Sequence, residues 1–228
     1  MPTINASKWG YGRVLAQSTH SAARNATTSQ AQGQQSSGVA QTFSYEKYVS
    51  GRSYLYSIYR AFFYVDTSSI TSTVASATLN VKGFTNGGSR AILVPSTAFG
   101  GDGSASIAAG DYDNLSFNTN YNSSFTIWNT SSNNAITLNS TALSDIENNN
   151  YFICALIEYD SDYLNSEPGS ATSEIWGIDF GTTVYLDYTL SGGGGPTNIS
   201  SFNGISSIHL SQISNVTYTG IDSINTVS

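Results

Sequence analysis

Nucleophilic or zinc chemistry in this sequence would depend on its two histidines. His20 lies in a stretch of serine, alanine, glutamine and threonine, and His209 lies near the C-terminal end. A serine or cysteine nucleophile needs a base within hydrogen-bond reach, and a structural zinc site needs clustered cysteine and histidine. Neither histidine has such neighbours in the sequence, so we expect no catalytic triad and no zinc.

Carboxylates offer the other chemistry, in two acidic clusters. Spaced oxygen ligands suit Ca²⁺, but neither cluster follows the twelve-residue loop with its glycine at position six and its final glutamate. Glycosidase acid and base pairs have no fixed spacing in sequence, because the fold sets their separation. We therefore expect no enzyme and no cofactor, with these residues in solvated loops, and Ca²⁺ binding is the alternative. The clusters are "GDYDNL" and "EYDSDYLNSE", with Asp111, Asp113, Glu158, Asp160, Asp162 and Glu167.

Arg60 lies inside the apolar stretch "SIYRAFFYV". A buried arginine needs a carboxylate partner. We expect Asp66 or Asp187 to pair with it, in a structural rather than a binding role.

Tyrosines in loops are the candidates for binding a sugar. Tyr112, Tyr121 and Tyr163 fall outside the expected strands, and loops held by a rigid scaffold commonly carry binding residues. Most of the fifteen tyrosines are better explained as core residues, so these three are predicted to form a glycan-stacking surface only if they are exposed.

Charge is sparse and uneven along the chain. Charged residues make up 10% of the sequence and the net charge is −7. All eight lysines and arginines lie at or before Arg90, and thirteen of the fifteen carboxylates follow it. An acidic surface repels nucleic acid, so we expect no nucleic-acid partner.

The targeting signals expected of a secreted or membrane protein are missing from the sequence. The start, "MPTINASKWGYGRV", lacks a basic segment followed by an apolar one, and no stretch approaches the roughly 18 apolar residues of a membrane span. We expect synthesis in a cytoplasm without a signal peptide, and no membrane span. The single Cys154, in "YFICALI", is predicted to be a small buried hydrophobe.

Many short strand patterns follow one another between residues 43 and 190. "SYLYSIYRAFFYVD" is the strongest, and "ASATLNVKGF" alternates Ala77, Leu79 and Val81 with polar residues. Eight or nine such strands with turn residues between them predict an all-β fold, an antiparallel β-sandwich or jelly roll. "TALSDIENN" is the one short helix expected.

The segments outside this region divide the chain further. Residues 1–42 are predicted to hold a first strand around Trp9 and then, over 16–42, a low-complexity arm, with the ordered body beginning near Phe43. Residues 191–198, "SGGGGPTN", are predicted to be a hinge. Residues 199–228 are then a separate tail.

The tail repeats itself at a spacing of eleven residues. "SSFNGISSIHL", "SQISNVTYTGI" and "DSINTVS" align their aliphatic residues in columns, and short strands with Asn-Gly-type corners fit these residue types better than a helix does. Burying so few aliphatics cannot offset the cost of ordering the segment. We therefore predict an assembly interface that forms a homotrimer or docks on another protein, with packing onto the chain's own sandwich as the alternative. The interface residues are Ile199, Phe202, Ile205, Ile208, Ile213, Val216, Ile221, Ile224 and Val227.

The central region also resembles a known family. The stretch "SIYRAFFYVDTSSITSTVASATLNVKGF", with "GDYDNL", "AITLNSTALSDI" and "VYLDYTL", is similar to the DNRLRE-type jelly-roll domain over residues 43–190. That family occurs in secreted wall-associated proteins and in phage virion proteins. The closing "GIDFGTTVYLDYTL" departs from the family's acidic and arginine-rich end, so no ligand site is carried over. The matching residues are Tyr59, Arg60, Phe62, Phe63, Asp66, Thr67, Ser76, Ala77, Thr78 and Leu79.

The tail resembles the short "F/I-N-G-I/V" repeats that end many tailed-phage structural proteins. Together the two resemblances imply a non-enzymatic virion structural protein of a tailed bacteriophage, of the head-fibre, decoration or tail-fibre type. Its expected partners are copies of itself and capsid or tail proteins, and its expected location is the virion. The alternative is a carbohydrate-binding module that recognises host-surface glycans.

Overall fold

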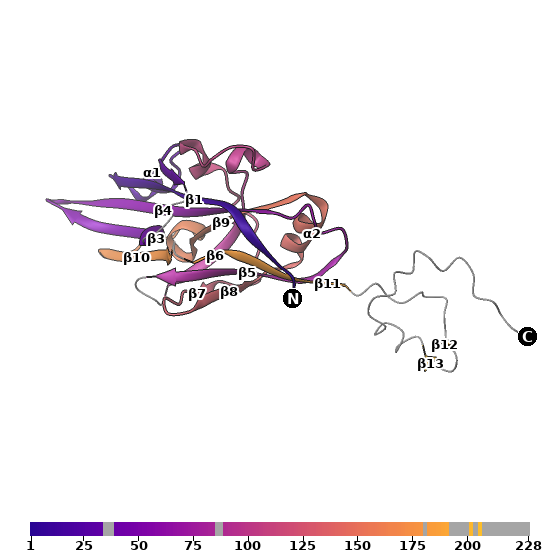
Figure 1. Cartoon of the computed structure of the whole chain (residues 1–228). Coiled ribbons are helices and arrows are strands. Elements are labelled where there is room, and N and C mark those ends of the chain that lie inside the picture. The colour runs from indigo at the N-terminus through magenta and orange to yellow at the C-terminus, as the bar shows by residue number, and fades with distance from the viewer. Residues whose placement is uncertain (34–38, 85–88, 180–181, 192–200, 203–204, 207–228) are drawn as a thin grey trace, which may run out of the picture. The chain divides into compact units, whose positions relative to one another are not determined.

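The computed structural model of the 228-residue chain describes residues 1–33, 39–84, 89–179, 182–191, 201–202 and 205–206. The chain divides into two units, Met1–Leu190 and Ser191–Ser228. Figure 1 shows the first unit as a β-sheet body with short helices.

Eleven strands, all paired antiparallel, form the described part of the first unit. The all-β prediction is therefore confirmed. Strands β2 and β3 were not predicted from the sequence. The strands are β1 (Thr3–Gln17), β2 (Gln30–Gly33), β3 (Val39–Ser50), β4 (Ser53–Asp66), β5 (Val74–Phe84), β6 (Arg90–Pro95), β7 (Thr126–Ile127), β8 (Asn133–Thr137), β9 (Tyr151–Glu158), β10 (Thr172–Asp179) and β11 (Tyr185–Leu190).

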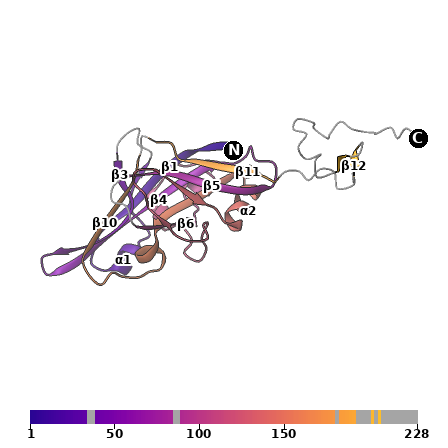
Figure 2. The ribbon, with the colours of Figure 1, turned by 90° about the horizontal axis from the view of Figure 1, so that it is seen from below.

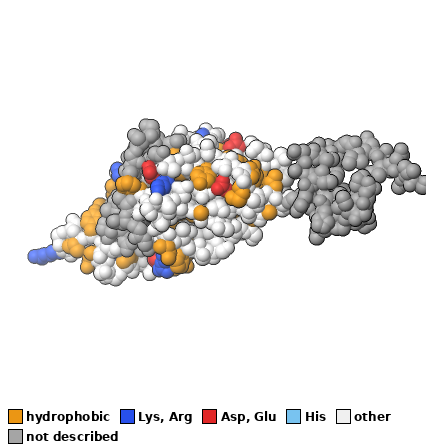
Figure 3. Space-filling view, turned by 60° about the horizontal axis from the view of Figure 1, so that its bottom comes forward, with side chains coloured by type: hydrophobic (Ala, Val, Ile, Leu, Met, Phe, Trp, Pro, Cys, Tyr) orange, Lys and Arg blue, Asp and Glu red, His pale blue; other side chains and the backbone are white. Residues whose placement is uncertain are grey.

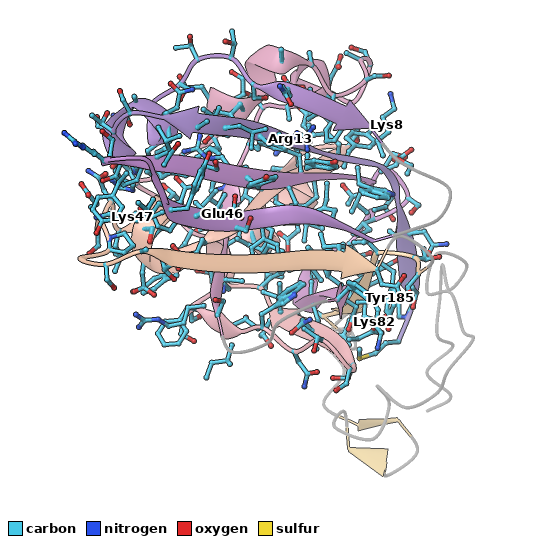
Figure 4. All side chains as sticks on the ribbon, turned by 90° about the vertical axis from the view of Figure 1, so that its left-hand side faces the viewer. Lys8, Arg13, Glu46, Lys47, Lys82 and Tyr185 are labelled. Carbon is cyan, nitrogen blue, oxygen red and sulfur yellow. The ribbon has the colours of Figure 1, made fainter. Side chains whose placement is uncertain are left out.

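The sheet is nearly closed on itself. Strand β1 pairs with β11, β11 with β5, β5 with β10, β10 with β3, β3 with β4, and β4 again with β1. Asn133 of β8 lies opposite Lys82 of β5. Its side chain donates a hydrogen bond to Tyr185 Oη of β11 at 3.2 Å, and Figure 4 shows Lys82 and Tyr185 close together. Closure leaves few unpaired strand edges.

Strand β4 lies in the middle of this sheet and is buried on both faces, because hydrophobic side chains pack against each face. It pairs with β1 on one side and, on the other, with β3 along its first half and β9 along its second. Side chains on alternate positions enter different clusters, as the two-residue period of a strand requires. Phe63 packs in the main core with Leu79 and Leu93, whereas Phe62 packs on the opposite face with Ile92 and Ile153.

Short helical segments connect and cover the strands. Figures 1 and 2 place α1 and α2 toward opposite ends of the body. The nine residues of α2 are the most in any described helix, and the described helices are all too short to cross a membrane. The segments are α1 (His20–Arg24), α2 (Ser140–Asn148), the 3₁₀ turns η1 (Phe99–Gly101) and η2 (Ala109–Asp113), and the π-helical turn η3 (Tyr159–Tyr163).

Helix α2 is the short helix expected from "TALSDIENN". Its N-cap is Asn139, whose side chain accepts a hydrogen bond from the Ala142 backbone N–H at 3.1 Å. Ala142 and Ile146, four residues apart and hence on one face, are fully buried in the main core. Cap and apolar face together explain why this segment is helical.

The N-terminal residues belong to the body. Strand β1 pairs with β4 from Ala6 to Gln17, α1 follows, and β2 returns to pair with Gly10–Arg13 of β1. The first strand is confirmed, but a mobile arm from residue 16 is wrong for the described residues up to Gly33. This polar stretch is ordered by backbone pairing and by the buried His20 and Ala23 of α1, neither of which needs a large apolar residue.

The second unit is described at Ser191 and at residues 201–202 and 205–206. Strand β12 (Ser201–Phe202) pairs antiparallel with β13 (Ile205–Ser206), so that Phe202 is opposite Ile205. The two strands flank Asn203 and Gly204 in the sequence, as expected for one Asn-Gly corner. The rest of the repeat lies outside the described residues.

Few charges lie on the surface of the body. On the face shown in Figure 3, hydrophobic side chains are scattered among uncharged polar ones, with a few blue and red groups. This agrees with the composition.

Gly83 leaves almost no room for a side chain in the described part of the fold. A Cβ there would lie 1.9 Å from the Asn129 carbonyl oxygen, at the point where β5 meets β10. We expect Gly83→Ala to lower the free energy of unfolding by about 1–3 kcal/mol, because the backbone must shift, as measured by urea denaturation. The control is Gly110→Ala, whose Cβ would meet no atom within 4 Å. Equal stability of the two variants would contradict the prediction.

Candidate functional site

The acidic segment after β9 folds around its own first carboxylate. Glu158 accepts hydrogen bonds from the backbone N–H groups of Asp160 (2.8 Å), Ser161 and Asp162 (3.3 Å). A helical turn leaves its first N–H groups without partners inside the turn. The Glu158 side chain satisfies three of them and so holds η3 in place.

The other carboxylates of this segment each bind a different cation. Asp160 accepts from Arg90 Nε at 2.8 Å, Asp162 binds Arg60, and Glu167 accepts from Lys47 Nζ at 2.9 Å. Hydrogen bonds from Tyr56 and Lys47 hold the pKa of Glu167 below its ordinary value. The prediction of a solvated loop is therefore wrong for Glu158 and Asp162, which are buried, whereas Glu167 is exposed.

The first acidic cluster also has a structural role. Asp111 is buried and accepts from the backbone N–H groups of Ala108 at 2.9 Å and Phe99 at 3.2 Å, while Asp113 is exposed. Across the described residues, no three histidine, cysteine, aspartate or glutamate side chains gather closely enough to hold a metal ion.

Arg60 has a different partner from the two that the sequence suggested. Its Nε and Nη2 donate to Asp162 Oδ2 and Oδ1 at 2.8 and 2.7 Å, and both side chains are fully buried. Asp66 instead accepts from Ser68, and Asp187 accepts from Thr3. The prediction failed because Arg60 points to the outer face of β4, where η3 covers the sheet.

The same guanidinium holds two further segments. Arg60 Nη1 donates to the Tyr112 carbonyl of η2 at 2.8 Å, and Nη2 donates to the Arg24 carbonyl of α1 at 2.7 Å. The Tyr112 ring lies 4.0 Å from the guanidinium carbon. One buried side chain thus joins α1, η2 and η3 over β4.

Beside η3 the surface is hollowed into a polar pocket of about 410 Å³. The lining comes from β3, the start of β6, the β9–η3 junction and residues 166–172. Glu158, Asp160, Arg90 and Pro168 complete the wall. Six hydroxyl-bearing residues contribute to it: Tyr45, Ser89, Ser161, Ser166, Ser170 and Thr172.

Two groups in this pocket are unusual for their burial. Glu158 is 4% exposed, and burial raises the pKa of its carboxyl to about 7, although the backbone N–H groups oppose that shift. Tyr45 is 1% exposed, and its Oη has no hydrogen-bond partner. Burial raises the pKa of this phenol, so it stays protonated and can donate.

His20 supports the pocket from α1. Its Nε2 is hydrogen-bonded to the Ser161 carbonyl at 2.8 Å, and its ring meets the edge of Tyr45 with centroids 5.6 Å apart. The histidine therefore fixes one lining residue of η3 and one of β3.

Two of the three tyrosines predicted for glycan stacking are buried. Tyr112 is 0% exposed and donates to the Ala23 carbonyl, and Tyr121 is 4% exposed and donates to Asp145. Neither can stack on a sugar, because both loops fold back onto the body. Tyr163 is half-buried and stacks on Tyr159 with centroids 5.8 Å apart.

The predicted assembly residues fall almost entirely outside the described part of the chain. Phe202 and Ile205 lie in β12 and β13. The structure describes no position for the others, which are Ile199, Ile208, Ile213, Val216, Ile221, Ile224 and Val227.

The fold and the site define an antiparallel all-β protein with a hydroxyl-lined pocket. No model of a known protein family matches the sequence, and no curated protein matches it either.

Only some of the pocket residues could be predicted from the sequence. Glu158 belonged to an acidic cluster, but nothing in the sequence marked it as the buried member. Tyr45 carried no signal, since its strand was missed. Its pairing opposite Ile58 is visible only once β3 is placed.

Breaking the Arg60–Asp162 pair should destabilise the protein strongly. We expect Arg60→Met and Asp162→Asn each to lower the free energy of unfolding by about 3–5 kcal/mol, because each removes the closest partner of a buried charge. Arg24 Nε, 3.9 Å from Asp162 Oδ1, is too distant to replace Arg60. The control is Arg90→Met, at a pair that is 42% and 36% exposed, where the loss should be under about 1 kcal/mol. Urea denaturation measures all three, and similar losses throughout would contradict the assignment.

Glu158 should make stability fall as pH rises. Its folded pKa of about 7 lies above the ordinary 4.5, so the folded state keeps a proton that the unfolded state has lost between these values. The free-energy cost of ionising this carboxyl in the folded state is absent below about pH 4.5. It reaches its full value, on the order of 3 kcal/mol, above about pH 7. In Glu158→Gln this part of the pH dependence should vanish, because the variant side chain does not ionise. The measurement is the free energy of unfolding by chemical denaturation from pH 4.5 to 8. If the plots of this free energy against pH were parallel for Glu158→Gln and wild type, the raised pKa would not belong to Glu158.

Proposed function

We propose that this chain is a non-enzymatic structural subunit of a tailed-phage virion, of the head-fibre, decoration or tail-fibre type. The observation that carries the proposal is the division of the chain after Leu190. The body buries its own core within Met1–Leu190, and the segment after it has an apolar repeat that lacks the length to bury itself. In this proposal the body is displayed and the tail assembles.

The charged groups of the body support a structural role. Asp162, Glu158 and Asp111 are all buried and hold loops through Arg60 or through backbone N–H groups. These carboxylates position segments of the chain. A protein exposed on a particle needs such fixed loops, because proteolysis begins at mobile ones.

Self-association is the simplest way to cover the tail. Three copies around an axis would bring equivalent columns of the eleven-residue repeat together, since closed symmetric oligomers bury the same residues of each chain. Capsid or tail proteins are the further partners of the proposal.

Glycan recognition is the second candidate function. It is favoured by one specific observation, the pocket beside η3 whose wall has six hydroxyl-bearing residues. The two functions are compatible, since a displayed body can carry a binding site.

Removing residues 191–228 should change the oligomeric state. We expect the full chain to run at three times its 24.2 kDa mass in light scattering or native mass spectrometry, and residues 1–190 to be monomeric. Ile213→Asp with Ile224→Asp should dissociate the trimer, because charge enters one apolar column. The matched control is Ser211→Asp with Ser223→Asp, which adds equal charge outside the columns.

Several outcomes would count against the proposal. A monomeric full chain excludes self-association, and equal dissociation by the serine control excludes the columns as the interface. The phage assignment is tested separately, by mass spectrometry of purified particles from the source of the gene, and absence of this chain from them would contradict it.

A further inference from the structure

The pocket beside η3 contains a buried donor that the folded chain does not use. Buried hydroxyls in folded proteins almost always have a partner, and leaving one unpaired costs free energy. Tyr45 Oη is without one at 1% exposure, and Tyr45 lines the pocket. The oxygen itself is almost fully covered, so a ligand hydroxyl in the pocket would supply the missing hydrogen bond after a small shift of the lining side chains.

The wall chemistry narrows the class of ligand. Hydroxyls donate and accept, and the Glu158 carboxylate accepts. Pro168 adds a small apolar surface. A volume of about 410 Å³ is within the ordinary range for small-molecule sites, roughly 300–1,000 Å³. These properties match a compact molecule with several hydroxyl groups.

The charge in the pocket excludes an anionic ligand. Its charged lining residues are Arg90, Asp160 and Glu158. Arg90 and Asp160 neutralise each other through a two-pronged ion pair, which leaves Glu158 as the only other ionisable lining carboxyl. A phosphate or an acidic sugar would find no unpaired cation here, whereas a neutral sugar hydroxyl can donate to Glu158.

Aromatic side chains continue the site past Arg90. The guanidinium carbon of Arg90 lies 4.8 Å from the Phe125 ring centroid and 5.3 Å from that of Tyr159. Tyr159 in turn stacks on Tyr163, and all three rings are partly exposed. An aromatic face next to a hydroxyl-lined pocket suits a chain of sugar units, in which one unit fills the pocket and the next lies on the rings.

We infer that this pocket is a binding site for a neutral saccharide, with Tyr45 and Glu158 as its hydrogen-bonding groups and Tyr163 at the stacking end. The inference names the site of the second candidate function. It does not rest on the tail or on assembly, because every residue involved lies within Met1–Leu190.

The test is a glycan array probed with the full chain, followed by titration calorimetry with methyl glycosides of glucose, galactose, mannose and N-acetylglucosamine. The array should carry neutral, sialylated and phosphorylated glycans. We expect binding to neutral glycans only. Tyr45→Phe should weaken it about five- to tenfold, as one lost hydrogen bond does, and Glu158→Gln and Tyr163→Ala should weaken it as well.

The control variant is Tyr48→Phe, which removes the same atom from an exposed tyrosine of the same strand and should bind as wild type does. Thermal unfolding separates binding from folding. Tyr45→Phe removes an unpartnered hydroxyl, so its melting temperature should not fall.

Three results would overturn the inference: no binding to any neutral glycan, a preference for acidic glycans, or unchanged affinity of Tyr45→Phe. None of these affects the mass of the full chain in solution, so failure here and failure of the assembly proposal are distinguishable.

Discussion

The buried ion pair between Arg60 and Asp162 is the interaction on which the arrangement of loops in the body depends. Removing two charges from water is costly, and the pair is tolerable because the guanidinium of Arg60 makes four hydrogen bonds in its buried position. Arg60 makes two bonds to Asp162 and one each to the carbonyls of Tyr112 and Arg24. Any displacement of α1, η2 or η3 would leave a buried charge or carbonyl unsatisfied, so the three segments are fixed together.

The strands and α2 could be predicted from the sequence because their signals are local. Strand β4 carries a long run of aromatic and β-branched residues, and α2 has its Asn139 cap and its apolar pair at the right spacing. Two of the eleven strands were not predicted. Strand β2 is polar and is ordered by backbone pairing with β1, and β3 begins in a polar stretch, although its Phe43 and Tyr45 are buried in the core. Composition correctly predicted the class but not this pairing.

The site could not be predicted, because its contacts join distant parts of the chain. Arg60 and Asp162 are 102 residues apart, and His20 meets Ser161 from 141 residues away. Proximity in sequence suggested Asp66, which lies on the same strand but six residues further along, about 20 Å away. Exposure of Tyr112 and Tyr121 was likewise inferred from loop position, whereas both rings are needed to fill space beneath those loops.

The pocket depends on the same buried pair. Glu158 and Ser161 line it: Ser161 belongs to the turn that Asp162 anchors to Arg60, and Glu158 is the N-cap of that turn. Fixing η3 in this way keeps the Glu158 carboxyl in a dry environment, where burial raises its pKa to about 7, and keeps Ser161 against His20. In the proposed saccharide site most lining groups are therefore already in position, so binding would order little of the protein and cost little conformational entropy. The buried charges that stabilise the loops thus also keep the hydroxyl-lined wall in place.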